Sequence, residues 1–425
     1  MSGLALVASQ LGAEVTASDR SRSIFTETLE EAGLPVSIGH REANVPADAE
    51  LVISAAIPAD NVERDVAQRR GQPEIYRSDL LAELTHLRRC VAVAGTHGKT
   101  TTTAMLVHIL ERCGADPAFI IGGLLRSAGG HARWGDGVLV VEADESDRSL
   151  LKYDVDLAVL LNAELDHHAH YQSNADVLAV FGRFLEGADE AVIAAEPELL
   201  ALRAGPVIEI PAVADRRVAS GRQTFDFEGT RVELPMQGAH NAANAAAALC
   251  VAKSLGIAVA DAAAALAGFP GIARRFEFIG RSPAGVGVFD DYGHHPTEVA
   301  SAVGAARDLA PDRLIVVFQP HLFSRTAHFT EEFAKALTGA DIVFVCDVYP
   351  ARELAADWPG VSGRVIVDAL LEAGAEDVRW APTLDEAERQ LRAELAAGDL
   401  CLVVGAGDVG TLGPRLVADA VAPAP

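Results

Sequence analysis

Cysteine and aromatic residues are scarce in this chain of 425 residues. The five cysteines are odd in number, far apart and never in a CxxC pair, which excludes a disulfide framework and a structural zinc site. This usage is typical of a reducing compartment. Because aromatics make up only 5% of the chain, its cores must be built from Ala, Val, Leu and Ile, which favours a layered α/β architecture.

Basic charge and long apolar runs are also lacking. There are 35 Lys and Arg residues against 60 Asp and Glu, a net charge of −25. That balance excludes a general nucleic-acid binder, since phosphate contacts need clustered cations, and it argues against an anionic membrane surface. No run reaches the roughly 18 apolar residues of a membrane helix, and the N-terminus lacks the basic region of a secretory signal. We expect a cytoplasmic protein with small-molecule partners, an anionic substrate included if a few cations are focused in one cleft.

Short β-branched runs instead alternate with amphipathic helical segments almost throughout. Length alone predicts about three domains, and repeated strand-then-helix units predict doubly wound parallel sheets. Gly- and Pro-bearing stretches at 71–78 and 268–273 mark the boundaries, giving domains 1–88, 89–271 and 272–425. Residues 207–235 look irregular. The expected strands are 15–18, 51–55, 90–94, 138–141, 157–161, 314–318, 342–346 and 400–404.

The first domain opens with a helix pattern at 2–11 rather than with a strand. A doubly wound nucleotide domain starts with a strand and a Gly-rich turn ahead of that helix. We therefore expect that Met1 is an internal methionine of a longer natural protein. The absent piece would be on the order of 10–20 residues, enough for one strand and one tight turn.

Residues 91–103 read VAVAGTHGKTTTT, an apolar strand running into a Gly-rich loop and a helix. The backbone N–H groups of such a loop, with the helix N-terminus, cradle phosphate oxygens. Lys99 would reach the β- and γ-phosphates, and the hydroxyl of Thr100 or Thr101 would bind Mg²⁺. The loop departs from the GxxxxGK[ST] form, because its first glycine would fall at Val93. Alternatively, the segment is only a Gly- and Thr-rich helix start that binds no ligand.

Two more strand ends carry polar residues. The segment VLVVEADESD, residues 138–147, puts Glu142 directly after a buried strand, where a carboxylate can hold Mg²⁺. The segment NAELDHHAH, residues 162–170, adds three histidines and two carboxylates, a candidate metal or phosphate site that ligand chemistry alone would assign to Zn²⁺ or Mn²⁺. Either segment could instead be a solvated surface.

Together these elements resemble the Mur ligase family, ATP-dependent enzymes that form amide bonds in peptidoglycan precursor synthesis. The resemblance extends over nearly the whole chain. It is carried by MSGLA (1–5), GTHGKTTT (95–102), EADESD (142–147), GAHNAANA (238–245), FPGIARRFE (269–277), DDYGHHPTE (290–298), FQPHLFSRT (318–326), DVYPARE (347–353) and GAGD (405–408).

The resemblance implies a fold and an activity. The fold would be a Rossmann-like N-terminal domain for a UDP-sugar, a central P-loop ATPase-like domain and a C-terminal Rossmann-like domain. The motifs are nearest to the member that joins L-alanine to UDP-N-acetylmuramate through an acyl phosphate made with ATP. Such an enzyme serves cell-wall synthesis and, through it, cell shape and division, as a monomer or homodimer.

It also implies roles for single residues. Thr100, Glu142 and His167 would hold Mg²⁺ or Mn²⁺, while Lys99 and Arg275 would offset charge repulsion between the carboxylate and the triphosphate. The remaining nucleotide contacts would be Gly95, Thr96, His97, Gly98, Thr101, Asn241 and Asp291, and the remaining substrate contacts Tyr292, His294 and Arg325. No residue is assigned as the base that deprotonates the amine.

Several of these residues could instead have purely structural roles. Arg275 and Arg325 could be structural ion-pair partners, Tyr292 and His294 packing residues, and Asn241 a helix cap. Leu322 stands where the family usually has arginine, which leaves the choice of amino acid open.

Whole functions compete as well. Within the class, the alternative is the recycling ligase that attaches a murein tripeptide to the same UDP-sugar. From other classes, a P-loop kinase or ATPase and a non-catalytic UDP-sugar-binding paralogue would share part of the pattern.

Overall fold

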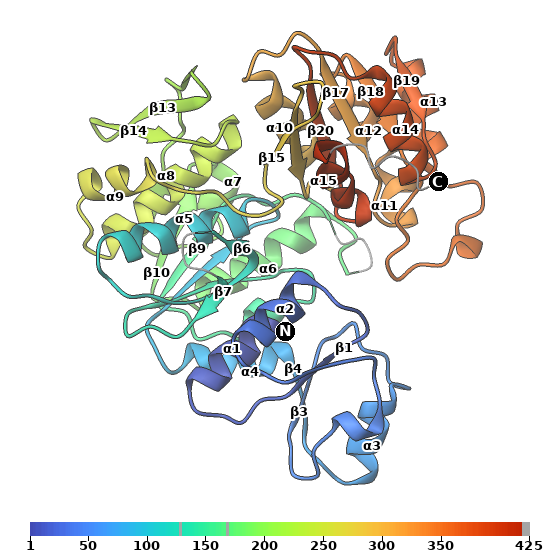
Figure 1. Ribbon diagram of the computed structural model, residues 1–425. Coiled ribbons are helices and arrows are strands. Elements are labelled where there is room, and N and C mark those ends of the chain that lie inside the picture. Colours follow the sequence, from blue (N-terminus) through green and yellow to red (C-terminus); the bar gives the residue numbers. More distant parts are fainter. Residues whose placement is uncertain (127–129, 167–169, 419–425) are drawn as a thin grey trace. The chain divides into compact units, whose positions relative to one another are not determined.

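The structure is a computed structural model, which describes residues 1–126, 130–166 and 170–418 (Figure 1). Its contacts divide the chain into two compact units. The first comprises residues 1–212 with 244–270, and the second comprises 213–243 with 271–425. Within the described ranges, no helix is both long enough and apolar enough to span a bilayer. The three domain ranges expected from the sequence stay a prediction.

The N-terminal part of the first unit is built on two short parallel strand pairs. β1 (Ala17–Asp19) pairs with β2 (Val36–Ile38), and β3 (Leu51–Ile53) pairs with β4 (Glu74–Tyr76). The helices of this part are α1 (Ser2–Gln10), α2 (Ile24–Glu31), α3 (Val62–Arg69) and α4 (Arg77–Thr85), with a 3₁₀ turn at Glu42–Asn44. Helices α2 and α3 begin at side-chain caps, where Ser23 and Asn61 accept backbone N–H groups.

The rest of the first unit is organised by a seven-stranded sheet in the order β11-β10-β9-β5-β8-β6-β7. All neighbours are parallel except β6 and β7 at one edge. The strands are β5 (Cys90–Ala94), β6 (Ala118–Leu125), β7 (Gly130–Arg133), β8 (Leu139–Glu142), β9 (Leu157–Leu160), β10 (Glu190–Ala194) and β11 (Val207–Ile210). The helices of this part are α5 (Lys99–Arg112), α6 (Asn174–Glu186), α7 (Pro197–Leu200), α9 (Val259–Leu266) and, from residue 244 onward, α8 (Ala239–Ser254), with a 3₁₀ turn at Ser149–Lys152.

The three central strands of this sheet explain where a site can form. Every residue of β5 and β9 is buried, as are the first three of β8, so these runs are continuously apolar as in a sheet covered on both faces. β5 lies between β8 and β9 and runs parallel to both. The carboxyl ends of all three strands therefore meet at one edge, where open α/β sheets bind ligands.

The second unit contains a six-stranded sheet in the order β15-β16-β20-β17-β18-β19, parallel except for β15. It also contains a small antiparallel sheet of β12 (Arg217–Ala219), β13 (Arg222–Phe227) and β14 (Thr230–Leu234). The strands of the larger sheet are β15 (Glu277–Arg281), β16 (Gly287–Asp291), β17 (Leu314–Phe318), β18 (Ile342–Val345), β19 (Val378–Trp380) and β20 (Leu400–Val404). Its helices are α10 (Pro296–Arg307), α11 (Phe323–His328), α12 (Thr330–Leu337), α13 (Gly363–Glu372), α14 (Leu384–Glu394) and α15 (Leu412–Val417), with 3₁₀ turns at Ala355–Asp357 and Asp408–Thr411.

The predicted α/β class with parallel sheets is confirmed, and all eight expected strands exist. Three of them, β5, β17 and β20, have the expected ends, and the other five differ by one or two residues at one or both ends. Residues 207–235 look irregular in sequence, and their strands cannot be placed from it, but the structure is regular there. They hold β11 to β14, whose strands are short and partly polar because most face the core with one side only, as the alternating burial of β13 shows.

Candidate functional site

The loop between β5 and α5 has a backbone that only glycine allows at two points. Gly95 has φ +140° and Gly98, the N-cap of α5, has φ +83°. A Cβ at Gly98 would collide with the side-chain amide of Asn244, and one at Gly95 would lie 3.1 Å from the Cβ of Leu161. The loop is therefore held close to its neighbours with its N–H groups at a helix N-terminus, a geometry suited to phosphate.

Asn162, at the end of β9, braces this loop. Its Oδ1 accepts the backbone N–H of His97 at 2.8 Å, and its Nδ2 donates to the His97 carbonyl at 3.0 Å. The Thr96 hydroxyl donates to the Glu164 carbonyl at 3.0 Å and accepts the Glu164 N–H at 2.8 Å. These bonds fix the loop without a ligand, so binding of a phosphate requires little further ordering.

Lys99 opens helix α5 and folds back over the loop. Its Nζ donates to the carbonyls of Gly95 at 2.5 Å and Thr96 at 3.2 Å, and to Oε2 of Glu145 at 2.8 Å. The Glu145 side chain is only 3% exposed. Burial acts to lower the pKa of Lys99, but the carboxylates of Glu145 and Asp144 outweigh it and raise that pKa above its ordinary value. The ammonium is thus kept charged beside the loop.

An oxygen-rich pair lies next to this lysine. The Thr100 hydroxyl, in the first turn of α5, donates to Oε2 of Glu142, the last residue of β8, at 3.0 Å. Oε1 of Glu142 accepts the N–H of Gly122 at 2.6 Å, and a Cβ at Gly122 would lie 3.2 Å from Oε2. A hydroxyl and a carboxylate are ligands that Mg²⁺ prefers, and the glycine leaves room beside them. Thr101, the other hydroxyl considered, is buried one residue further along α5.

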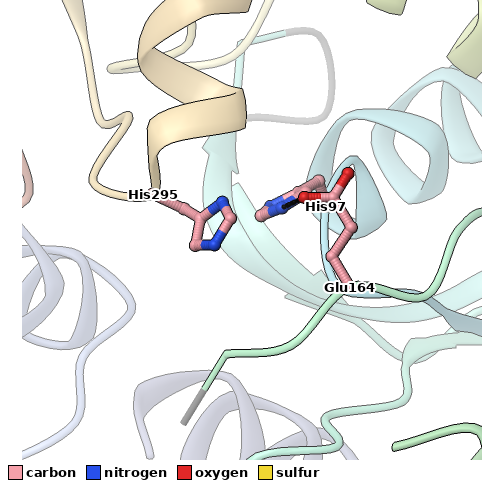
Figure 2. Close-up of side chains that lie close together, drawn as sticks. All are labelled: His97, Glu164 and His295. Atoms are coloured by element: carbon pink, nitrogen blue, oxygen red, sulfur yellow. Dashed lines mark ion pairs between the residues drawn. The ribbon is translucent and has the colours of Figure 1, made fainter. Parts of the chain in front are cut away.

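The histidine segment after β9 is described only in part. Figure 2 shows the imidazole of His97 beside the Glu164 carboxylate, with Nε2 3.4 Å from Oε2. Asp166 is buried. His167, which the resemblance assigns to metal, lies outside the described residues. The third side chain labelled in Figure 2, His295, caps α10 in the second unit by accepting the N–H of Thr297.

In the second unit, two adjacent arginines have different surroundings. Arg274, at φ +60°, donates to Asp290 at 3.0 Å, to the Gly405 carbonyl at 2.6 Å and to the Gly407 carbonyl at 3.4 Å. It therefore ties the start of β15 to the turn after β20. Burial raises the pKa of Asp290, against the attraction of the Arg274 guanidinium.

Arg275 is held much more loosely. Its guanidinium lies 3.8 Å from a carboxylate oxygen of Glu298 and 5.3 Å from the ring centroid of Tyr292. The Arg274 guanidinium lies 4.9 Å from the same ring centroid. A long ion pair and a cation–π contact can both be exchanged for a ligand at small cost. Of the two arginines, Arg275 is the one suited to bind an anion.

Asp291 ends β16 and organises the turn that follows. Its two oxygens accept the N–H groups of Gly293 at 2.7 Å and Phe276 at 2.8 Å. Burial raises the pKa of Asp291 to about 6, although Arg275 and the two backbone donors oppose that shift. Its carboxylate acts on the backbone in this structure.

The other predicted residues of this unit have identifiable contacts. His294 lies with Nδ1 3.1 Å from the Tyr292 carbonyl and 3.3 Å from Glu298. Arg325 is buried in α11, with a guanidinium nitrogen 3.4 Å from His321 Nδ1. Asn241 does not use its side chain as an N-cap acceptor: its Nδ2 donates to the carbonyl of Gln237 at 2.7 Å.

Each unit thus gathers its own set of predicted residues. In the first, the loop, Lys99, Thr100 and Glu142 meet at the carboxyl edge of the sheet. In the second, Arg275 and Tyr292 lie together, with His294 beside the ring at 5.5 Å between centroids. Sequence reasoning did not single out Glu145 or Asn162, although a carboxylate and an amide directly after buried strands beside a phosphate loop were a usable signal.

Comparison with known families covers most of the chain. Residues 1–89 match the model described as "Mur ligase family, catalytic domain", residues 93–252 match "Mur ligase middle domain", and residues 274–407 match "Mur ligase, glutamate ligase domain".

Individual relatives match over nearly their full length. The UDP-N-acetylmuramate–L-alanine ligase of Streptomyces avermitilis is 42% identical, covering 98% of this chain and 94% of that protein, and that of Acidithiobacillus ferrooxidans is 41% identical over 97% and 94%. Among solved structures, the UDP-N-acetylmuramate-alanine ligase of Thermotoga maritima superposes with a TM-score of 0.85 at 28% identity, covering 98% of this chain and 95% of that one. A murein peptide ligase of Psychrobacter arcticus gives 0.69 at 26% identity, with the same coverage.

Proposed function

Because the chain belongs to the Mur ligase family, we propose that it joins L-alanine to the carboxylate of UDP-N-acetylmuramate and uses ATP to drive the reaction. This step belongs to peptidoglycan precursor synthesis. The observation that carries the proposal is the 42% identity to a ligase of that specificity over 98% of the chain. The braced phosphate loop with a charged lysine supports the ATP half of the reaction independently.

The chemistry follows from two successive substitutions. A carboxylate oxygen of the muramic acid attacks the γ-phosphorus of ATP, ADP leaves, and an acyl phosphate forms. The amine of L-alanine then attacks the acyl carbon, phosphate leaves with the electrons of the C–O bond, and the nitrogen loses a proton. Lys99 would offset the charge on the transferring phosphoryl group. Arg275 would reduce the charge repulsion between the substrate carboxylate and the triphosphate.

A divalent cation fits the oxygen pair beside the loop. Thr100 and Glu142, with His167 as a third ligand, would hold Mg²⁺ or Mn²⁺. Such an ion would neutralise triphosphate charge and orient the γ-phosphoryl group. The hydroxyl and the carboxylate lie 3.0 Å apart beside a glycine, so small oxygen-preferring cations are the ones that suit them.

The remaining contacts are assigned on the same basis. ATP would be bound mainly by residues 89–271, the UDP-sugar by residues 1–88, and the amino acid by residues 272–425. We infer a cytoplasmic enzyme, since its substrates are nucleotides, acting as a monomer or homodimer. The nucleotide contacts are Gly95, Thr96, His97, Gly98, Thr101, Asn241 and Asp291, and the substrate contacts are Tyr292, His294 and Arg325.

One assay tests the proposal. ADP release is measured with ATP and Mg²⁺, adding L-alanine and UDP-N-acetylmuramate separately and together, and the product is identified by mass. We expect ADP release over many turnovers only when L-alanine and UDP-N-acetylmuramate are both present, because the acyl phosphate formed from UDP-N-acetylmuramate alone has no amine to consume it. Release without either substrate would indicate a plain ATPase.

The main competitor is a ligase that accepts a murein peptide, because such a structure matches over 98% of this chain. Leu322, where arginine is usual, lies beside His321 and Arg325 and bears on this choice. A competition assay between L-alanine and the murein tripeptide decides it. Preferential use of the tripeptide would move the protein to the recycling function.

A further inference from the structure

Glu63, at the second position of α3, is the centre of a buried hydrogen-bond cluster in the N-terminal part of the chain. Its Oε2 accepts the hydroxyl of Ser18 at 2.6 Å and lies 3.0 Å from Nδ1 of His40. Its Oε1 accepts the side-chain amide of Asn44 at 2.6 Å and the backbone N–H of Arg41 at 3.2 Å. The carboxylate is 8% exposed. One side chain thus engages four partners from three other segments.

These partners come from the ligand-binding edge of a parallel strand pair. Ser18 is the middle residue of β1 (Ala17–Asp19), while His40 and Arg41 lie two and three residues beyond the end of β2 at Ile38. β1 and β2 run parallel in register, so the loops that follow them leave the same edge. In doubly wound sheets, nucleotides bind outside that carboxyl edge. Glu63 therefore ties the end of β1 to the segment that follows β2, at the place where a nucleotide would lie.

Packing of α3 does not require a charged side chain at position 63. The apolar anchor of α3 is a small cluster of Val45, Val66 and Ala67, with Leu51 packed against it. Burial acts to raise the pKa of Glu63, but the four hydrogen bonds outweigh it and hold the pKa below its ordinary value. Burying a carboxylate is costly even when it is well bonded, and an apolar side chain would often serve stability as well. The gain from Glu63 is a defined loop geometry.

We propose that Glu63 is a positioning residue for the uridine-nucleotide end of the substrate, acting through the end of β1 and the segment that follows β2. The inference rests on the proposed function, since it takes the UDP-sugar to bind to this part of the chain. Glu63 itself need not touch the substrate.

The test compares three variants by their KM values for UDP-N-acetylmuramate, ATP and L-alanine. Glu63→Ala removes all four acceptor contacts, and we expect it to raise the KM for the UDP-sugar about tenfold while the KM for ATP stays unchanged. Glu63→Gln should restore most of the affinity. Its oxygen can face the obligate donors of Arg41 and Asn44, while its amide faces Ser18 and His40, which are both able to accept.

Glu74→Ala is the matched control. Glu74 starts β4 and binds Arg64 of the same helix α3 through two bonds of 2.8 and 3.0 Å, away from the two loops. It should lower the thermal midpoint without a selective change in the KM for the UDP-sugar. If Glu63→Ala changes that KM no more than the control does, the inference is wrong.

Two further measurements separate the remaining outcomes. If Glu63→Ala does not fold, Asn44→Ala removes a single loop contact and should still raise the KM for the UDP-sugar selectively; an unchanged KM would overturn the inference. Absence of product with the wild-type protein would instead refute the proposed function. In that case, calorimetric binding of UDP-N-acetylmuramate to wild type and to Glu63→Ala still tests the role of Glu63, and equal affinities would refute it.

Discussion

The unfolding free energy of the first unit should depend strongly on the ion pair of Lys99 and Glu145. Lys99→Met would remove the Lys99 ammonium from beside the Glu145 carboxylate, whose side chain is only 3% exposed. The folded protein can escape that penalty by protonating the carboxyl group. At pH 7.3, about three units above the ordinary glutamate pKa, protonating a carboxyl group costs about 4 kcal/mol. The loss of unfolding free energy that comes from the buried charge therefore cannot exceed about 4 kcal/mol.

The variant's pH dependence follows from the same limit. A carboxyl whose pKa is raised in the folded state binds its proton more tightly there than in the unfolded state, so the folded state gains stability as the pH falls. The deficit of Lys99→Met relative to wild type should therefore shrink between pH 7.3 and pH 5.3, by up to about 1.4 kcal/mol per unit. Glu145→Gln should cost less, about 2–3 kcal/mol, because Lys99 keeps its two carbonyl acceptors.

Urea unfolding followed by the fluorescence of Trp134 measures these losses. The chain has three tryptophans, so a Trp358→Phe, Trp380→Phe background leaves one reporter, which lies just after β7 in the first unit. The variant that combines Lys99→Met with Glu145→Gln should be more stable than the sum of the two single losses predicts, by at least about 2 kcal/mol. Additive losses within about 0.5 kcal/mol, or a deficit of Lys99→Met that does not change with pH, would refute the reasoning.

Four other variants test the site. Glu142→Gln should raise the Mg²⁺ concentration for half-maximal activity about tenfold or more, because a carboxylate ligand is lost; an unchanged titration would exclude Glu142 as a ligand. Arg274→Lys should cost about 2 kcal/mol of unfolding free energy, since it breaks a bridge to three acceptors, whereas Arg275→Lys should lower kcat with little change in stability; the reverse result would exchange their roles. For Asp291→Asn, the unfolding free energy relative to wild type should shift in the variant's favour by about 3 kcal/mol in total as the pH rises from well below 3.8 to well above 6, because wild type loses stability across that range as its raised carboxyl ionises in the folded state. A difference that is flat with pH contradicts this.

The phosphate loop could be predicted because its signal is local. An apolar strand, two glycines and a helix start lie within a dozen residues, and each has a direct backbone consequence. The braces of the loop could not be predicted in the same way. Asn162 acts on His97 from 65 positions away and Glu145 acts on Lys99 from 46, so their roles depend on the lateral order of strands, which the sequence does not state.

The two arginines show a second limit of sequence reasoning. Arg274 and Arg275 are adjacent in one motif, and residue type does not distinguish them. Their difference comes from the backbone, where a positive φ at Arg274 directs its side chain to Asp290 and the turn after β20. A left-handed conformation at a non-glycine residue leaves no mark in the sequence pattern. The preference for Arg275 rested on position within the motif, and its role stays a prediction.

The buried cysteines have a practical consequence for measurements of local opening. Cys90 lies in β5 of the first unit and Cys401 in β20 of the second, both fully buried and outside any disulfide. Burial raises the pKa of the Cys401 thiol to about 12, and that of Cys90 also lies well above its ordinary value. Since the thiolate is the reactive form, a thiol reagent attacks each only when its strand is transiently exposed. The rate of modification at each position thus reports how often that particular sheet opens, so the protein carries an internal probe for each of its units.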